Sequence, residues 1–294
     1  MAPSRQTEVT ALPVRIGDLT IAIEGNLSKG KRDVPPSYEP FIQTGRPDVR
    51  LHLHRGSFDG DRGERIFACP PVWSLHRGSG SLLVEIFHEL RGLGLERTLV
   101  LGPAPEAADL YFSGASGRFA DPFFGPVLEL LMVHHLARGK GVIVHGCGIG
   151  PGERGILFIG ESGAGKSTLA NLWRDQRGID ALSDDRIIVR PAGGGFRMHG
   201  TPWHGEGRFA SPRSARLERV FFLRHGGENA IRPLRGIEAV SRLLPCSFPP
   251  HWDAAGMDFT LGFFGDLAAR VPCAELAFRP DGSAIAFLTD LMEK

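Results

Sequence analysis

The sequence has 294 residues, of which 42% are hydrophobic, so it can form one large domain or two modest ones with a real core. Its 34 basic and 33 acidic side chains nearly cancel, which excludes the overall field that would favour a nucleic acid or an anionic membrane as partner. Four widely spaced cysteines without a Cys-x-x-Cys pair indicate neither a zinc site nor a disulfide framework. Because no apolar run has the length of a signal peptide or a membrane span, we expect a cytoplasmic protein with reduced thiols.

The first 120 residues contain short β-type runs separated by Gly, Pro and Asp clusters. Several of these runs alternate apolar and polar residues, which predicts a small, mainly antiparallel sheet. The runs are 14–23, 49–53, 81–86 and 97–101. The proline-rich stretch 34–40 is expected to be a surface loop. For His52 and His54, which share one strand face, we favour a solvated face over a metal pair because no cysteine or carboxylate cluster accompanies them.

Near Asp121-Pro122 the sequence pattern changes from short β-type runs to apolar residues at helical spacing. We therefore expect a first domain over residues 1–120 and a second over 121–294. Asp121 suits an N-cap and Pro122 a first helical turn, and apolar residues then recur with helical spacing as far as Val133. The later elements predicted are strands over 141–146, 155–159, 181–189 and 219–223, a glycine-rich turn over 149–153 and a short helix over 237–244.

Residues 160–168 read GESGAGKST, which matches the phosphate-binding pattern G-x-x-x-x-G-K-[ST] without a mismatch. A strand-like run precedes the pattern and a helix-like segment follows it, so the glycines can let backbone N–H groups converge on a polyphosphate at a helix N-terminus. The predicted nucleotide-binding residues are Gly160, Glu161, Ser162, Gly163, Ala164, Gly165, Lys166, Ser167 and Thr168. Lys166 can reach the β- and γ-phosphates, and the Ser167 hydroxyl can ligate Mg²⁺. A glycine-rich turn that binds nothing would leave the lysine unexplained.

Ser183-Asp184-Asp185 is the best candidate for the chemistry, because it lies within an apolar run soon after the helix-like segment. One carboxylate can orient and deprotonate an attacking hydroxyl, while its neighbour can hold Mg²⁺ directly or through water. Adjacent strand residues point to opposite faces, so the two aspartates should differ in role. The alternative is an ordinary turn or the solvated end of an edge strand.

His145 ends an apolar strand at a His-Gly step, and it is either a site residue or a buried, hydrogen-bonded core histidine. The segment 200–208 brings Glu206 and Arg208 into one turn-rich stretch. Such a loop can close over a phosphate and exclude water. Equally, Trp203 can pack on the core while the charges face solvent.

The order His145-Gly146, then GESGAGKST, then Ser183-Asp184-Asp185 resembles the HPr kinase/phosphorylase superfamily, whose catalytic domain is related to phosphoenolpyruvate carboxykinases. The order is more specific than any of its pieces, and the likeness covers roughly residues 121–294. It implies an α+β or α/β fold, in which a P-loop core on a mixed β-sheet with flanking helices follows a small β-rich N-terminal domain.

The resemblance also implies roles for individual residues. His145 would lie by the transferred phosphate, Lys166 and Ser167 would bind phosphates and Mg²⁺, and Asp184 would accept the proton of the substrate serine. Family members that act on HPr carry a Glu-x-Arg-Gly-x-Gly signature after the paired aspartates, whereas this chain has Gly-Thr-Pro-Trp-His-Gly-Glu-Gly. The chain therefore looks more like the branch with peptide-tailoring and free-serine kinases, with Glu206 in place of the signature glutamate as metal ligand.

The leading hypothesis is a Mg·ATP-dependent kinase that phosphorylates a hydroxyl, in most cases a serine, of a peptide, protein or small-molecule acceptor. Its expected catalytic residues are Asp184, His145 and Lys166, and its expected metal ligands are Ser167, Asp185 and Glu206. An ATPase or GTPase switch and a non-catalytic nucleotide sensor stay open as alternatives. Against a switch, the sequence has neither a Leu-Ser-Gly-Gly-Gln nor an Asn-Lys-x-Asp motif. Related kinases often form ring-like or dimeric assemblies, which leaves a homo-oligomer open.

Overall fold

The computed structural model describes residues 10–25, 34–70, 72–88, 93–112, 124, 126–151, 153–161, 163–174 and 179–293. The chain forms two compact units, one of Met1–Arg15 with Leu19–Met132 and one of Ile16–Asp18 with Val133–Lys294. The predicted domain boundary after residue 120 and the predicted helix start at Asp121-Pro122 lie outside the described residues. Both stay predictions.

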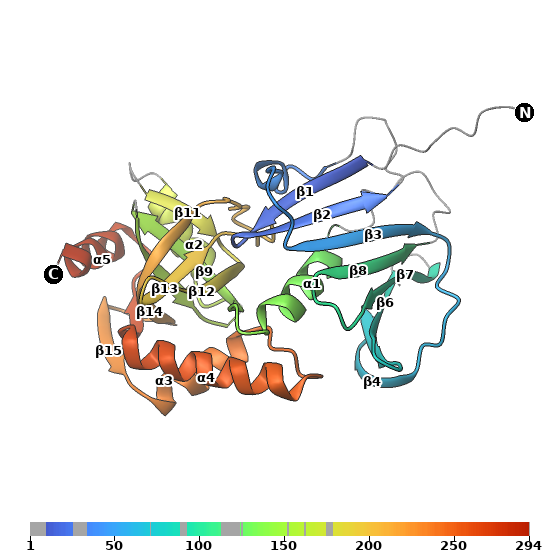
Figure 1. Cartoon of the computed structure of the whole chain (residues 1–294). Coiled ribbons are helices and arrows are strands. Elements are labelled where there is room, and N and C mark those ends of the chain that lie inside the picture. Colours follow the sequence, from blue (N-terminus) through green and yellow to red (C-terminus); the bar gives the residue numbers. More distant parts are fainter. Residues whose placement is uncertain are drawn as a thin grey trace, which may run out of the picture. The chain divides into compact units, whose positions relative to one another are not determined.

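The first unit contains an eight-stranded sheet (Figure 1). Its strands are β1 (Thr10–Ile16), β2 (Leu19–Gly25), β3 (Val49–Arg55), β4 (Glu64–Cys69), β5 (Trp73–Arg77), β6 (Leu82–His88), β7 (Leu93–Leu101) and β8 (Ala107–Phe112). Their spatial order is β1-β2-β3-β8-β7-β6-β5-β4. The strands from β4 to β8 pair antiparallel, as expected, but β3 pairs parallel with both β2 and β8, so the sheet is mixed.

One sequence prediction for this unit is wrong. The expected strand 14–23 is two strands, because Gly17 and Asp18 both have positive φ, +57° and +59°, as a two-residue hairpin turn requires. The alternation of apolar residues continues across this turn and so conceals it. The proline-rich stretch 34–40 lies mostly at the surface, as expected, although Tyr38 is buried and the stretch leads into a 3₁₀ turn, η1 (Glu39–Phe41).

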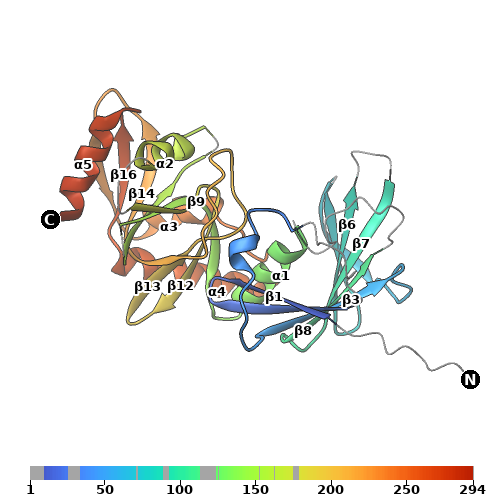
Figure 2. The ribbon, with the colours of Figure 1, turned by 90° about the horizontal axis from the view of Figure 1, so that it is seen from above.

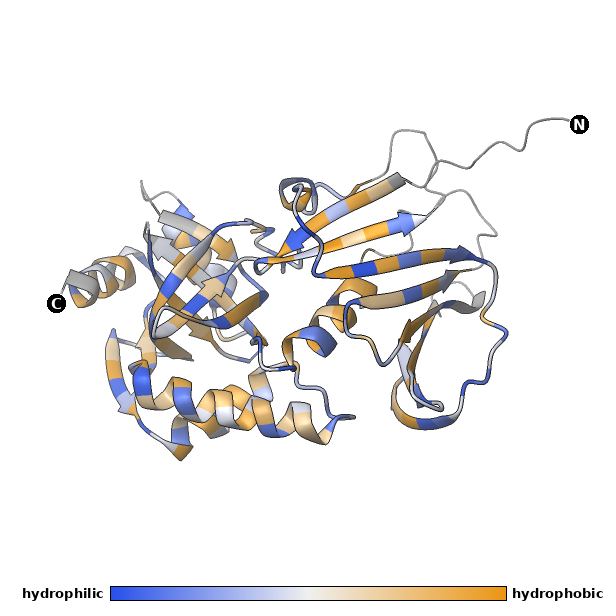
Figure 3. Cartoon of the chain, viewed as in Figure 1, coloured by the Kyte–Doolittle hydropathy of each residue, from blue (hydrophilic) through white to orange (hydrophobic). Residues whose placement is uncertain are grey.

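The polar face expected at His52 and His54 is present on β3, along which hydrophobic and hydrophilic residues alternate (Figure 3). His54 lies 2.7 Å from Asp109, and His52 lies 3.6 Å from Glu24. Both imidazoles are well exposed and have carboxylate neighbours. They belong to a solvated sheet face, and no metal-holding cluster of His, Cys, Asp or Glu occurs in the described part of the chain.

The rest of the chain combines a second mixed sheet with helices on its faces (Figures 1 and 2). The strands are β9 (Val142–Pro151), β10 (Arg154–Ile159), β11 (Ile179–Ser183), β12 (Arg186–Ala192), β13 (Gly195–His199), β14 (Ser214–His225), β15 (Ala230–Leu234) and β16 (Cys273–Phe278). The helices of this unit are α2 (Lys166–Arg174), α3 (Ile237–Leu243), the 3₁₀ turn η3 (Leu244–Cys246), α4 (Ala254–Arg270) and α5 (Gly282–Glu293). The remaining helix, α1 (Pro126–Leu136), has its first residues in the first unit and its last in the second.

The strand order is β10-β9-β12-β13-β14-β16-β15, and β11 pairs with β9. β14 also pairs parallel with β10, so the sheet closes on itself from β10 through β9, β12 and β13 to β14. As a result, β10 lies between the antiparallel β9 and the parallel β14. The segment that follows the carboxyl end of β10 is therefore flanked by residues of β9 and of β14.

Helices pack on two faces of this sheet. Alternate residues of β10 and β14 enter two different cores: Leu157, Ile159 and Phe222 join the cluster under α3 and α4. Phe158 and Phe221 join the cluster under α2 and α5, which lie side by side in Figure 2. Burial on both faces explains why these strands read as continuous apolar runs.

The predicted strands 141–146, 155–159 and 219–223 are found in β9, β10 and β14, and the predicted helix 237–244 is found as α3. One expectation is wrong: the run 181–189 is two strands, β11 and β12, which are separated by a bend at Asp184-Asp185. The described helices include none with both the length and the apolar character needed to cross a membrane.

Candidate functional site

The glycine-rich loop 160–165 connects β10 to α2, so the predicted order of strand, loop and helix is present. Ser162 lies outside the described residues. Gly163 and Gly165 have φ values of +83° and +94°, a conformation that L side chains rarely adopt. At Gly165 a Cβ would also come within 2.7 Å of the Phe278 ring. The loop therefore depends on glycine at both positions.

Lys166, the first residue of α2, is only 7% exposed and folds back over the loop. Its Nζ donates to the carbonyl oxygens of Gly160 at 2.6 Å and Glu161 at 3.0 Å. Burial lowers the pKa of Lys166, and the nearby Cys246 and Asp185 act in the opposite direction. The Asp185 carboxylate is thus among the charges that act on this ammonium group.

Asp184 is 2% exposed, and backbone groups saturate its carboxylate. Oδ1 accepts the N–H groups of Gly205 at 3.0 Å and Phe209 at 3.3 Å, and Oδ2 accepts that of Gly207 at 2.7 Å. A Cβ at Gly205 or Gly207 would come within 3.0 or 2.7 Å of Oδ2. The carboxylate therefore anchors the 203–209 loop, whose backbone encloses it.

Asp185 faces a different environment, with a side chain 18% exposed. Its Oδ1 lies 2.9 Å from Nδ1 of His145, and its other oxygen contacts Arg186. Burial acts to raise the pKa of Asp185, but the hydrogen bond from His145, with Arg186 and Lys166, holds it below its ordinary value. The structure thus brings together two sequence-predicted residues, Asp185 and His145, and Lys166 is a third whose charge acts on Asp185.

The two aspartates differ in burial and in hydrogen-bond partners, and the difference does not come from opposite faces of one strand. They lie in a bend, where the Ser183 Oγ accepts the N–H groups of Asp185 and Arg186 at 3.3 Å and donates to the Trp203 carbonyl at 3.1 Å. His145 is likewise not a buried core histidine, because its side chain is 31% exposed and pairs with Asp185.

In the segment 200–208, the tryptophan packs in the core and the charged side chains face solvent, which is the second of the two predicted arrangements. Trp203 is buried, whereas the side chains of Glu206 and Arg208 are exposed. Among the described residues no three His, Cys, Asp or Glu side chains form a metal-holding group. The predicted metal ligands Ser167, Asp185 and Glu206 stay predictions. Ser167 and Asp185 offer hard oxygen donors of the kind that Mg²⁺ prefers, and phosphate oxygens and water commonly fill its other positions.

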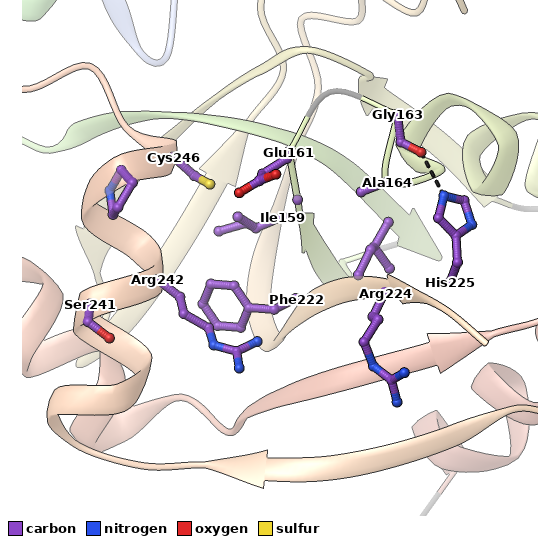
Figure 4. Close-up of a pocket in the computed structure, with 13 residues that line it drawn as sticks. Ile159, Glu161, Gly163, Ala164, Phe222, Arg224, His225, Ser241, Arg242 and Cys246 are labelled. Atoms are coloured by element: carbon purple, nitrogen blue, oxygen red, sulfur yellow. Dashed lines mark hydrogen bonds between the residues drawn. The ribbon is translucent and has the colours of Figure 1, made fainter.

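A pocket of about 570 Å³ opens beside the loop (Figure 4). Its walls are the loop at 160–164, the carboxyl end of β14 and the segment from α3 to η3. His225 fixes part of the rim, since its Nε2 lies 2.8 Å from the Gly163 carbonyl oxygen. Sequence reasoning missed the β14 and α3 residues because they carry no motif. Only the pairing of β10 with β14 brings them to the loop.

No protein-family model and no curated protein matches this chain. Among solved structures, it is similar to the Hpr(Ser) kinase/phosphatase from Coxiella burnetii, with a TM-score of 0.29 and 13% sequence identity. The match covers 51% of this chain and 92% of that chain. This similarity is weak.

Proposed function

We propose that this protein is a kinase related to the HPr kinase/phosphorylase superfamily, which transfers the γ-phosphoryl group of Mg·ATP to a hydroxyl group. The acceptor is a serine or similar alcohol of a peptide, a protein or a small molecule. One observation carries the proposal: a loop with the sequence of a phosphate-binding loop runs from β10 into α2, and its Lys166 folds back over it, where the charge of Asp185 acts on the ammonium group. Phosphate binding and a proton acceptor are the two parts that phosphoryl transfer requires.

The loop supports phosphate binding through its backbone and through Lys166. The N-terminus of α2 points N–H groups and a partial positive charge toward the loop. Lys166 now donates to two neutral carbonyl oxygens, those of Gly160 and Glu161. A phosphate oxyanion is a stronger acceptor than a carbonyl, so an entering nucleotide would draw the ammonium group toward itself.

The proton acceptor in this proposal is Asp185, in place of the predicted Asp184. Asp184 is buried and already accepts three backbone N–H groups, which makes it a positioning residue for the 203–209 loop. Asp185 is accessible and ionised at neutral pH, and His145 orients it. A weak base is sufficient here, because the transition state of phosphoryl transfer is loose and the hydroxyl proton leaves late.

The predicted metal ligands fit Mg²⁺ in part. Ser167 in the first turn of α2 is the residue that would hold the ion, whereas Asp185, which accepts the proton in this proposal, would reach the ion only through water. When bound, Mg²⁺ would neutralise charge on the phosphate oxygens. Glu206 stays a prediction without further support, since its exposed side chain belongs to the loop that Asp184 anchors.

The test is an incubation with ATP labelled at the γ-phosphate, Mg²⁺ and a panel of serine-containing peptides together with free serine. We expect label in an acceptor with the parent protein, and a loss of about 100-fold or more with Asp185→Asn at unchanged ATP affinity. Rapid hydrolysis without an acceptor would favour an ATPase instead. Tight ATP binding without any labelled product would favour a nucleotide sensor, and parental transfer by Asp185→Asn would remove this residue from the mechanism.

A further inference from the structure

The 203–209 loop is held from two sides, although it contains neither helix nor strand. Asp184 accepts three of its N–H groups. From α2, Arg174 donates to the Gly207 carbonyl at 3.0 Å, and its guanidinium carbon lies 4.5 Å from the centre of the Phe209 ring. A loop fixed in this way presents its exposed side chains in defined positions, so that little conformational entropy is lost when a ligand binds them.

The same loop borders the proposed proton acceptor. A Cβ at Gly205 would lie 3.5 Å from the Cβ of Asp185, so the backbone at Gly205 packs against this aspartate. The N–H group of Arg208 donates to the Gly205 carbonyl at 3.2 Å and closes a turn over residues 205–208. An acceptor hydroxyl at Asp185 would therefore lie beside this turn, whose exposed side chains are Glu206 and Arg208.

Arg208 has a backbone conformation that favours glycine. Its φ is +57°, and the only other non-glycine residue with positive φ in the described ranges is Asp18, in the turn between β1 and β2. This conformation is unfavourable for arginine, and backbone strain of this kind is concentrated at functional sites. The loop has glycine at 205 and 207, yet the position that suits glycine by its φ carries a guanidinium group. We infer that position 208 is needed for its side chain.

The exposed side of the loop is cationic. Within the part of the chain that the structure describes, the guanidinium group of Arg208 has no ion-pair partner, whereas the exposed Arg216 on β14 lies 3.2 Å from Glu218. Arg174 adds a second exposed positive charge at the loop, against the one carboxylate that the loop exposes, that of Glu206. A guanidinium group in a fixed position suits a carboxylate, which it can bind through two parallel hydrogen bonds.

We propose that Arg208 selects the phosphoryl acceptor by binding a carboxylate that lies close to the acceptor hydroxyl. This inference rests on the proposed function and names its substrate class, an alcohol with an acidic group nearby. Two kinds of acceptor have this chemistry: a serine next to Asp or Glu in a peptide, and a free hydroxy amino acid with its own α-carboxylate. Arg208 is a specificity residue in this arrangement, and proton transfer stays with Asp185.

The first experiment compares acceptors that differ in one charge. One pair is a capped peptide with Asp beside the serine and its counterpart with Asn, and the other pair is free serine and serinamide. We expect the parent to prefer the acidic member of at least one pair by about 5-fold or more in kcat/KM, mainly through KM. The pair that shows the preference identifies the kind of acceptor. Equal use of both members in both pairs would overturn the inference.

Variants then assign the preference to one side chain. Arg208→Gln should lose it, and Arg208→Glu should reverse it in favour of a peptide with Lys beside the serine. Arg216→Gln is the matched control, because it removes an exposed arginine that already has a glutamate partner, and it should retain the parental preference. A parental preference in Arg208→Gln would also overturn the inference.

Arg208→Gly separates this role from a structural one. The variant removes the guanidinium group and relieves the positive φ, so it should unfold at or above the parental urea concentration while losing the preference. A clear loss of stability in Arg208→Gly would give Arg208 a structural role and overturn the inference.

A binding measurement separates failure of the inference from failure of the proposed function. The acidic peptide with Ala in place of the serine cannot be phosphorylated there, and its affinity is measured by fluorescence anisotropy. If the parent phosphorylated no acceptor, the proposed function would fail. Binding of this peptide that weakens in Arg208→Gln would then still support a carboxylate site at Arg208, whereas equal affinities of the parent and Arg208→Gln would refute that site as well.

Discussion

Replacing Asp184 by Asn tests the division of roles between the two adjacent aspartates. The carboxylate is 2% exposed and accepts the N–H groups of Gly205, Gly207 and Phe209. Asn retains one acceptor oxygen, and its amide group would face the remaining N–H as a second donor. At best, two of the three hydrogen bonds survive, and both lose their charge.

The magnitude follows from these contacts. A buried donor left without an acceptor costs about 1–3 kcal/mol, and a hydrogen bond to a charged group is worth about 1.5–3 kcal/mol against roughly 1 kcal/mol for a neutral one. We therefore expect Asp184→Asn to lower the free energy of unfolding by about 2–4 kcal/mol. The loss should appear together with loosening of the 203–209 loop.

The assay is urea unfolding of the parent, Asp184→Asn and Asp185→Asn, with phosphoryl transfer measured on the same samples. Asp185→Asn is the matched control because it makes the same chemical change at an accessible neighbour, and its loss of stability should be smaller. The reasoning is refuted if Asp184→Asn unfolds at the parental urea concentration but no longer transfers phosphate, because Asp184 would then be the proton acceptor.

Three further predictions concern the loop, pH and thiols. Gly163→Ala should lower the free energy of unfolding by about 1–2 kcal/mol through its positive φ alone. Gly165→Ala should lower it further, because the added Cβ also meets the Phe278 ring. Equal urea midpoints for the two variants would contradict this. The stability contributed by ionised Asp185 is complete above the ordinary pKa of 3.8 and is lost as the pH falls through its lowered folded-state value. The difference in urea midpoint between the parent and Asp185→Asn should therefore persist to pH 3.8, and its disappearance near neutral pH would argue against the ion pair. Burial raises the pKa of Cys273 to about 11, so a thiol reagent at neutral pH should react with exposed Cys69 at once and with Cys273 only after unfolding, as peptide mapping would show.

The local sequence pattern was sufficient to predict the strands that are buried on both faces and the elements on either side of the glycine-rich loop. The run at 155–159, the loop after it and the helix that follows were predicted from neighbouring residues alone, since glycine conformation and apolar continuity are local properties. Local pattern was insufficient where alternation passes through a tight turn. The hairpin at Gly17-Asp18 and the bend at Asp184-Asp185 both lie inside runs that read as single strands.

The sequence by itself determined which residues carry charge and where the glycine-rich loop would form between a strand and a helix, because those features depend on residues close together in the chain. Tertiary structure decided which aspartate is accessible, since the N–H groups that enclose Asp184 come from residues 205–209, far along the chain. It also decided where the pocket lies, because the parallel pairing of β10 with β14 brings Phe222 to the end of the loop. Hydrogen-bond partners and cavity walls arise from such distant contacts, and no local pattern encodes them.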